Sequence, residues 1–240
     1  MSRTSQNEVT SVAERFEVET AQGVLEWAIH MFGSKVALAS SFGAEDVVLI
    51  DMLAKIDGKA RVFTIDTGRL HQETYNLIDA IREKYGIAIE VYFPKDEQVE
   101  GMVKEHGLNL FYKSADLRTL CCHVRKVEPF KKVLSELDAW ITGLRREQAL
   151  TRVSIKKVEI DHANEGIVKI NPLADWTSQQ VWAYIRENNV PYNNLFDQGY
   201  ASIGCGPCTR PIKPGEDARA GRWWWEKGTK ECGLHWRFQA

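Results

Sequence analysis

The chain has 240 residues, with 31 Lys and Arg against 33 Asp and Glu, which gives a formal net charge of −2. This near-neutral balance argues against a protein that coats nucleic acid. No apolar run approaches the roughly 18 residues that a membrane span needs, and residues 1–14 lack the apolar core of a signal peptide. We therefore expect a soluble, cytoplasmic protein that binds neither nucleic acid nor membrane. A homo-oligomer is compatible with the sequence.

Domain organisation follows from length and from changes in pattern along the chain. At about 150 residues per domain, 240 residues suit one large domain with a tail. We expect a flexible polar start over 1–15, a nucleotide-binding α/β domain over 16–213 and a C-terminal tail over 214–240. The tail is too short for a domain of its own, yet it is rich in Arg and Trp and contains one Cys.

Apolar runs and helical periodicity alternate along the chain. After a helical pattern over 18–31, the runs predict strands at 36–40, 62–65, 87–93 and 139–142, with helices at 44–56 and 71–85, a hairpin over 155–170 and a helix over 177–188. Such strand–turn–helix units predict an α/β fold with a parallel sheet and helices on both faces. Ligands of these sheets bind at the carboxyl ends of the strands. The turns that follow the strands are therefore the first candidates for a site.

Two of these turns have a composition suited to anions. A small Gly-containing turn before a helix exposes backbone N–H groups that can bind phosphate or sulfate. Either turn alone is equally compatible with a plain structural role, but two on neighbouring strands favour a nucleotide site. The candidate substrate residues in these turns are Ser40, Ser41, Phe42 and Gly43 in the first, and Thr67, Gly68 and Arg69 in the second.

The cysteines show a second pattern. The five are Cys121, Cys122, Cys205, Cys208 and Cys232. An adjacent pair together with C-x-x-C indicates a metal centre rather than core packing or disulfides. A single zinc needs four ligands that converge on one point, whereas a four-iron cluster lets neighbouring thiolates reach different irons. The spacing favours the cluster over zinc, and the expected ligands are Cys121, Cys122, Cys205 and Cys208.

The remaining thiol, Cys232, lies among Lys230, His235 and Arg237. A cationic environment lowers a thiol pKa and raises the fraction of nucleophilic thiolate. If four cysteines hold a metal centre, Cys232 has no resolving thiol in its own chain. The second thiol must then come from another molecule or subunit.

Together these motifs resemble the assimilatory adenylyl-sulfate (APS) reductases. The resemblance runs from about residue 35 to the C-terminus, and its motifs are Ser41-Phe-Gly-Ala-Glu-Asp46, Asp66-Thr-Gly-Arg-Leu70, Cys121-Cys122, Cys205-x-x-Cys208 and Glu231-Cys-Gly-Leu-His235. It implies an adenine-nucleotide α-hydrolase-like fold of the PP-loop type with a C-terminal active-site tail. It also implies a [4Fe-4S] cluster on the four cysteines and reduction of APS to sulfite and AMP, with thioredoxin as electron donor.

The resemblance also assigns roles to individual residues. Cys232 would attack the sulfur of APS to form a thiosulfonate, which thioredoxin would resolve. Lys126 would link cluster and substrate electrostatically, and we prefer an electrostatic or positioning role for the cluster itself. The further substrate-binding candidates are Arg145 at a strand end, Arg219 and Arg222 in the tail, and His235. Phe42 stands where many members have Ser, so only backbone contacts are expected there.

Three other functions fit part of the sequence. A phosphoadenylyl-sulfate (PAPS) reductase would share the fold and the Cys232 motif but would not need four clustered cysteines. An ATP-dependent adenylating or thiolating enzyme would share the first turn, and a zinc-based redox sensor would explain the thiols alone. Glu45 and Asp46 at the first turn favour APS over PAPS, because carboxylates repel an added phosphate. Alternatively, both acids complement the N-terminus of the helix.

Overall fold

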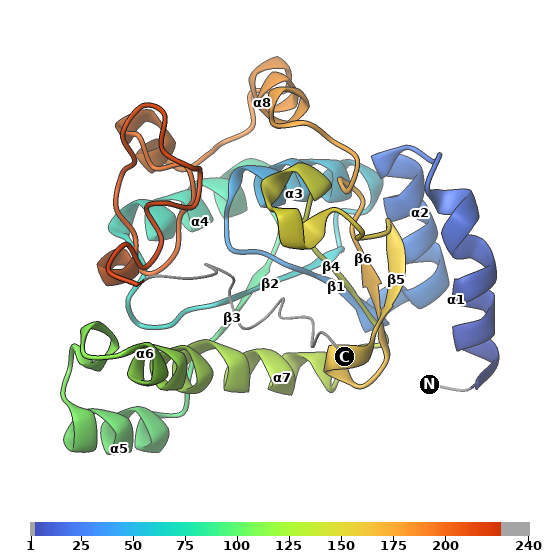
Figure 1. Cartoon of the computed structure of the whole chain (residues 1–240). Coiled ribbons are helices and arrows are strands. Elements are labelled where there is room, and N and C mark those ends of the chain that lie inside the picture. Colours follow the sequence, from blue (N-terminus) through green and yellow to red (C-terminus); the bar gives the residue numbers. More distant parts are fainter. Residues whose placement is uncertain (1–2, 227–240) are drawn as a thin grey trace. The chain divides into compact units, whose positions relative to one another are not determined.

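The computed structural model describes residues 3–226 and contains one six-stranded sheet (Figure 1). The strand order is β3-β2-β1-β4-β6-β5. The strands are β1 (Val36–Ala39), β2 (Arg61–Ile65), β3 (Ile89–Tyr92), β4 (Ala139–Ile141), β5 (Val158–Asp161) and β6 (Ile167–Ile170). The mostly parallel sheet with helices confirms the predicted α/β class, and every predicted strand is present within a few residues.

The pairing pattern places the ends of two strands together. β1 is parallel to both β2 and β4, and β4 is parallel to β6. β5 and β6 form the predicted antiparallel hairpin, which turns through Glu165 and Gly166, both at positive φ. The chain leaves β1 towards β2 on one side and later returns to β4 on the other. The segments after β1 and β4 therefore flank the point where the strand order reverses, which is the usual ligand position in open α/β sheets.

Eight α-helices lie within the described residues. They are α1 (Arg3–Phe16), α2 (Ala21–Phe32), α3 (Ala44–Ile56), α4 (Gln72–Tyr85), α5 (Asp96–His106), α6 (Ala115–Cys122), α7 (Glu128–Leu134) and α8 (Ser178–Glu187). Helix α3 follows β1 directly and packs against α2 and α8. Its residues Val47–Leu53 are all buried, including Asp51. A helix buried on every side in this way fixes the position of its own N-terminus.

Helix α1 occupies most of the segment where the sequence suggests a flexible start. Val9, Ala13 and Phe16 are buried along one face of the helix, at the spacing that brings side chains to one stripe. The helix packs against β5. Glu17, just after it, accepts a hydrogen bond from the Lys157 backbone N–H at 2.9 Å. The sparse apolar residues of this polar segment are therefore sufficient to pack it.

The chain forms two compact units. The first comprises the described residues up to Thr64 with 74–90 and 136–193, and the second comprises 65–73, 91–135 and the described residues from Asn194 onward. The first holds the turn after β1, and the second holds the turn after β2 and the four cysteines. The predicted boundaries at 15 and 213 stay a prediction.

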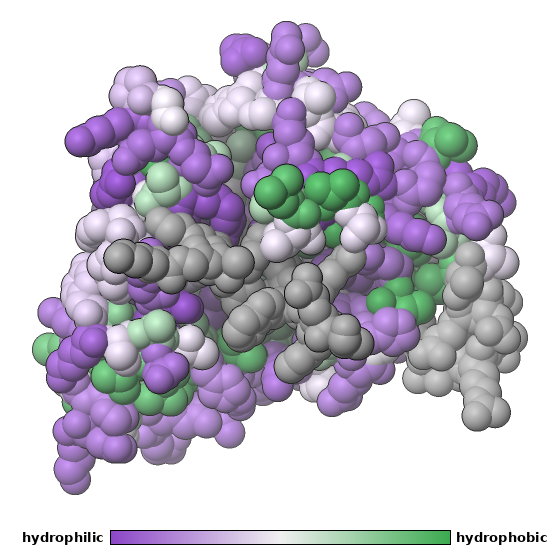
Figure 2. All heavy atoms as spheres, viewed as in Figure 1, coloured by the Kyte–Doolittle hydropathy of each residue, from purple (hydrophilic) through white to green (hydrophobic). Residues whose placement is uncertain are grey.

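The face drawn in Figure 2 is mostly hydrophilic, with separate apolar groups. In the first unit, Val18 and Leu150 are 90 % and 94 % exposed. Among the residues that the structure describes, no helix combines the length and apolar character needed to cross a membrane.

Candidate active site

The first turn, Ser40–Gly43, is organised around the carboxylate of Asp46. One oxygen of that carboxylate, Oδ2, accepts the Ser41 backbone N–H at 2.6 Å, the Ser41 hydroxyl at 2.9 Å and the Gly43 N–H at 3.4 Å. Of the other two N–H groups, that of Phe42 donates to the Ser40 hydroxyl oxygen at 3.1 Å and that of Ser40 donates to the Phe63 carbonyl at 2.8 Å. The N–H groups that the sequence offers to a substrate anion therefore already have acceptors within the protein.

Asp46 is held in a confined position. It is buried, and a Cβ added at Gly143 after β4 would lie 2.4 Å from its Oδ1 atom. Burial raises the pKa of Asp46 to about 6, although the hydrogen bonds from Ser41 favour the ionised form. Position 143 must therefore be glycine for Asp46 to reach the turn. Asp46 was predicted only as a charge at this helix N-terminus, and its contacts with Ser41 and Gly43 are new.

Arg145, also after β4, is buried between carboxylates. Its Nε atom lies 2.8 Å from Glu45, and its Nη1 lies 2.8 Å from Glu147 and 3.2 Å from the Trp176 carbonyl. Donation from the Ser178 N–H and from Arg145 holds the pKa of Glu147 below its ordinary value. Arg145 thus neutralises Glu45, one of the two acids expected to repel an added phosphate.

The second turn is stabilised by its own side chains. Asp66 accepts the Gly68 N–H at 2.7 Å, and the Thr67 hydroxyl accepts the Arg69 N–H at 3.3 Å. Gly68 has a φ of +71°, a conformation that glycine adopts without strain. The Arg69 guanidinium donates to the Leu108 carbonyl at 2.7 Å. The turn therefore keeps its shape without a ligand.

The same turn contacts the cysteines. The Thr67 hydroxyl lies 3.3 Å from the Cys205 sulfur. The Thr67 carbonyl accepts a hydrogen bond from Arg125 Nη1 at 2.8 Å, and Arg125 also hydrogen-bonds Cys121. Thr67 is thus connected to both cysteine pairs, one directly and one through Arg125.

All four cysteines of this unit belong to one hydrophobic cluster. Cys121 and Cys122 end α6, while Cys205 and Cys208 flank a single 3-10 turn over Gly206–Cys208. The four pack with Met102, Leu110, Phe111, Val124 and Trp223, and none of them forms a disulfide. Segments separated by more than 80 residues therefore bring their thiols together, as the sequence predicts.

A π-helical turn follows the adjacent cysteines. It spans His123–Val127 and joins α6 to α7 in one continuous helical stretch. Consecutive residues of an α-helix point about 100° apart. Cys121 is nevertheless buried and Cys122 half-buried in the same cluster. A π turn of this kind often marks a functional site.

Guanidinium groups surround the thiols. Arg118 and Arg125 stand four residues before Cys122 and four residues after Cys121, and each hydrogen-bonds its cysteine. Burial raises the pKa of the Cys121 and Cys208 thiols, and Arg125 opposes this at Cys121. Arg118 and Arg125 were not among the predicted site residues, although the i,i+4 spacing to the cysteines would have found them.

Several buried nitrogens of the second unit have no hydrogen-bond partner among the described residues. They are Arg125 Nε, Arg222 Nε, Trp223 Nε1, Trp225 Nε1 and His71 Nε2. A buried N–H without an acceptor is costly, so these positions suggest a missing acceptor. The sulfurs of an iron–sulfur cluster accept hydrogen bonds of this kind.

The donor set bears on what the four thiols could hold. Within the described part of the chain, no group of three or more His, Cys, Asp or Glu side chains is placed to hold a metal ion. Four thiols around a common region, with cationic groups and unpartnered N–H donors, suit a cluster that distributes its ligands over several irons.

The other predicted residues occupy separate places. Lys126 lies in the π-helical turn, the Arg219 N–H donates to Asp217 at 2.8 Å, and the buried Arg222 donates to the Ile203 carbonyl at 3.0 Å. Cys232 and His235 lie outside the described residues. The substrate roles of all these residues stay predictions.

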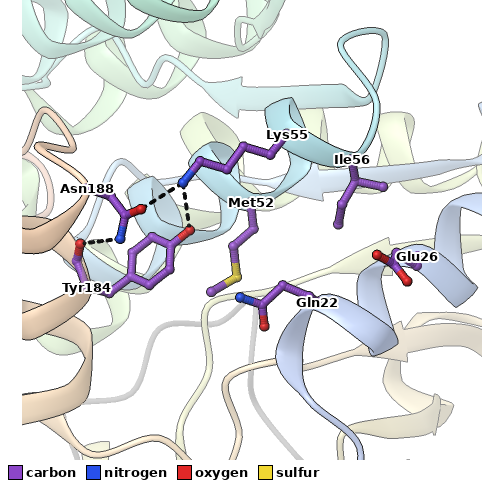
Figure 3. Close-up of a pocket in the computed structure, with 7 residues that line it drawn as sticks. All are labelled: Gln22, Glu26, Met52, Lys55, Ile56, Tyr184 and Asn188. Atoms are coloured by element: carbon purple, nitrogen blue, oxygen red, sulfur yellow. Dashed lines mark hydrogen bonds between the residues drawn. The ribbon is translucent and has the colours of Figure 1, made fainter.

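A separate surface pocket of about 640 Å³ lies in the first unit. Lys55 projects over it and donates to Asn188 at 2.8 Å and to the Tyr184 hydroxyl at 3.3 Å (Figure 3). Tyr184 in turn donates to the buried Asp51 at 2.7 Å. The pocket contains none of the predicted site residues.

Comparison with known proteins identifies the family. Residues 35–211 match the phosphoadenosine phosphosulfate reductase domain. The chain belongs to this family. Within the reductase family, it is 54 % identical to the adenosine 5'-phosphosulfate reductase of Burkholderia cepacia, over 84 % of this chain and 80 % of that protein. The corresponding protein of Allochromatium vinosum is 52 % identical, over 84 % and 79 %.

Solved structures agree with this assignment. A crystal structure of the PAPS reductase of Candida auris, in a phosphate complex, matches 85 % of this chain and 97 % of that chain with a TM-score of 0.73 and 34 % identity. An FMN adenylyltransferase of Candida glabrata matches with a TM-score of 0.57 and 16 % identity, over 87 % and 68 % of the two chains. The second likeness shows the fold alone. It supports the PP-loop type of architecture for this reductase family member.

Proposed function

We propose that this protein reduces adenylyl sulfate to sulfite and AMP in sulfate assimilation. It is an oxidoreductase acting on a sulfur group. The observation that carries this is its identity of 47–54 % with proteins named adenosine 5'-phosphosulfate reductase, over about four-fifths or more of both partners. The clustered thiols in a cationic environment fit the same activity, because the attacking thiolate, the substrate APS and the leaving group AMP are all anions.

The chemistry requires a nucleophilic thiol, and the proposal assigns this role to Cys232. Its thiolate attacks the sulfur of APS, so that an S–S bond forms and the S–O bond to the phosphate breaks. AMP leaves with the bonding electron pair, and the sulfonate stays on Cys232. One thiol of reduced thioredoxin then attacks Cys232 Sγ and expels sulfite. The second thioredoxin thiol releases Cys232, so the dithiol supplies both electrons.

The resident metal centre in this proposal is a [4Fe-4S] cluster held by Cys121, Cys122, Cys205 and Cys208. When bound, it contributes an electrostatic environment and fixes the cysteine segments relative to one another. Arg118 and Arg125 offset the charge of the thiolates. Thr67, through its contacts with Cys205 and Arg125, holds the second turn beside the cysteines.

Cationic residues would hold the phosphosulfate. Arg222 is buried in the cysteine-containing unit with its Nε atom unpartnered among the described residues. Lys126 follows the cysteine pair within the π-helical turn, and Arg219 is three residues before Arg222. Positive groups that are fixed before the reaction neutralise the sulfate and phosphate, which otherwise repel a thiolate.

PAPS reduction is the second candidate, because the solved structure of the Candida auris protein carries that name. The test compares sulfite release from APS and from PAPS under the same supply of reduced thioredoxin. A kcat/KM for APS that is much higher than that for PAPS supports the proposal. Equal values, or a preference for PAPS, contradict it.

A further inference from the structure

The first turn has the backbone geometry of an anion-binding nest. Phe42 has a φ of +58° between residues of ordinary conformation, and this directs the N–H groups on either side of it towards one point. Those of Ser41 and Gly43, with the Ser41 hydroxyl, all meet Asp46 Oδ2. One carboxylate oxygen therefore occupies the position that a phosphate oxygen would take in an open nest.

We propose that Asp46 is an internal anion that closes the first turn to the phosphate or sulfate groups of ligands. It acts as a specificity-determining residue: a nucleoside triphosphate cannot be held at this turn by its phosphates. The part of a nucleotide that meets the turn is then uncharged. The inference concerns anion binding alone and does not depend on the proposed reductase activity.

The surroundings of Asp46 prevent an external anion from displacing it. Asp46 lies in the first turn of α3, whose following residues are buried on all sides. Gly143 leaves no space for the carboxylate to move away, since even a Cβ there would lie 2.4 Å from Oδ1. An intramolecular ligand also needs no loss of translational freedom on binding, so a free anion competes poorly with it.

Few other charges bear on Asp46. Glu45, its neighbour on α3, disfavours its ionisation. On the segment after β4, Arg145 pairs with Glu45 at 2.8 Å and with Glu147 at 2.8 Å. Because burial raises the pKa of Asp46 to about 6, its carboxylate loses its charge as the pH falls below neutrality.

The test measures sulfate binding to the full-length holoenzyme by isothermal titration calorimetry. Sulfate keeps its charge over this pH range. At pH 7.5, Asp46→Ala should bind sulfate about tenfold or more tightly than the native protein, because the vacated N–H groups accept a charged oxygen. Asp46→Asn should show a smaller gain, since its amide oxygen still accepts. The control Glu26→Gln removes the same charge elsewhere in the unit and should match the native protein.

ATP and AMP provide a second comparison. Asp46→Ala should gain affinity for ATP relative to AMP. In the native protein, sulfate affinity should rise as the pH falls from 7.5 to 5, and this rise should be smaller in Asp46→Asn. If Asp46→Ala does not fold, Asp46→Asn and the pH series decide. Folded variants with native sulfate affinity, together with a pH dependence equal to that of the native protein, would overturn the proposal.

Discussion

The carboxylate of Asp46 and the backbone of Gly143 are in such close contact that a Cβ at position 143 would lie 2.4 Å from Asp46 Oδ1. Gly143→Ala must therefore displace the carboxylate or the segment after β4. We expect a loss of about 1–3 kcal/mol in the free energy of unfolding, as for other overpacked sites. Denaturant unfolding measures this loss.

Gly58→Ala is the matched control for this substitution. No atom lies within 4 Å of a Cβ at position 58. We expect this variant to equal the native protein or to be slightly more stable, because alanine restricts the unfolded chain. If the two variants were equally stable, the close contact would have no energetic consequence.

Asp46 also predicts a pH dependence of stability. Its pKa in the folded protein is about 6, against an ordinary value of 3.8. A carboxyl whose folded pKa is raised contributes stability below the unfolded pKa and loses it as the pH rises through the folded pKa. The stability of the native protein relative to Asp46→Asn should therefore fall by about 2 kcal/mol between pH 4 and pH 7. Parallel denaturation series measure the difference, and a constant difference would contradict the raised pKa.

The cysteine cluster predicts a metal content. Protein purified without oxygen should be brown and contain about four irons and four sulfides per chain. Cys122→Ala and Cys205→Ala should lose both, whereas Cys232→Ser should keep them, because Cys232 is the thiol outside the set. Iron and acid-labile sulfide analysis distinguishes these cases. Stoichiometric zinc without sulfide would contradict the cluster.

Substrate preference follows from the carboxylates at the first turn. PAPS carries one more phosphate than APS, and a site that selects it needs additional cationic donors. The segment from Ser40 to Ala54 contains no Lys or Arg, so it supplies no such cationic donor. We expect kcat/KM to favour APS by roughly a hundredfold. Because Arg145 neutralises Glu45, Asp46 should account for most of the repulsion of the additional phosphate of PAPS. If Asp46→Asn kept the same preference for APS over PAPS, this role of Asp46 would be refuted.

The sequence predicts the sheet well because its strands are short apolar runs separated by clear turns. It also predicts that Cys121, Cys122, Cys205 and Cys208 meet, since C-x-x-C together with an adjacent pair is typical of thiols that share one metal centre. Helix α1 was missed because only three buried apolar residues on a polar segment pack it. That packing depends on β5, which is far away in the sequence.

The turn after β1 shows the other limit of sequence analysis. Its composition indicates an anion-binding turn, but composition does not reveal that Asp46 itself supplies the anion. That follows only from the approach of Gly143 and the left-handed conformation of Phe42. The environment of the thiols is a similar case, because Trp223 packs with the cysteines and Arg222 interacts electrostatically with Cys208 through tertiary folding rather than through sequence spacing.

The most direct test of the proposed function is the mass of the enzyme after incubation with APS in the absence of thioredoxin. The account predicts one added sulfonate on the peptide that contains Cys232, lost as sulfite when reduced thioredoxin is added, and absent in Cys232→Ser, which should also have no turnover. A sulfonate on another residue, or normal turnover by Cys232→Ser, would contradict it.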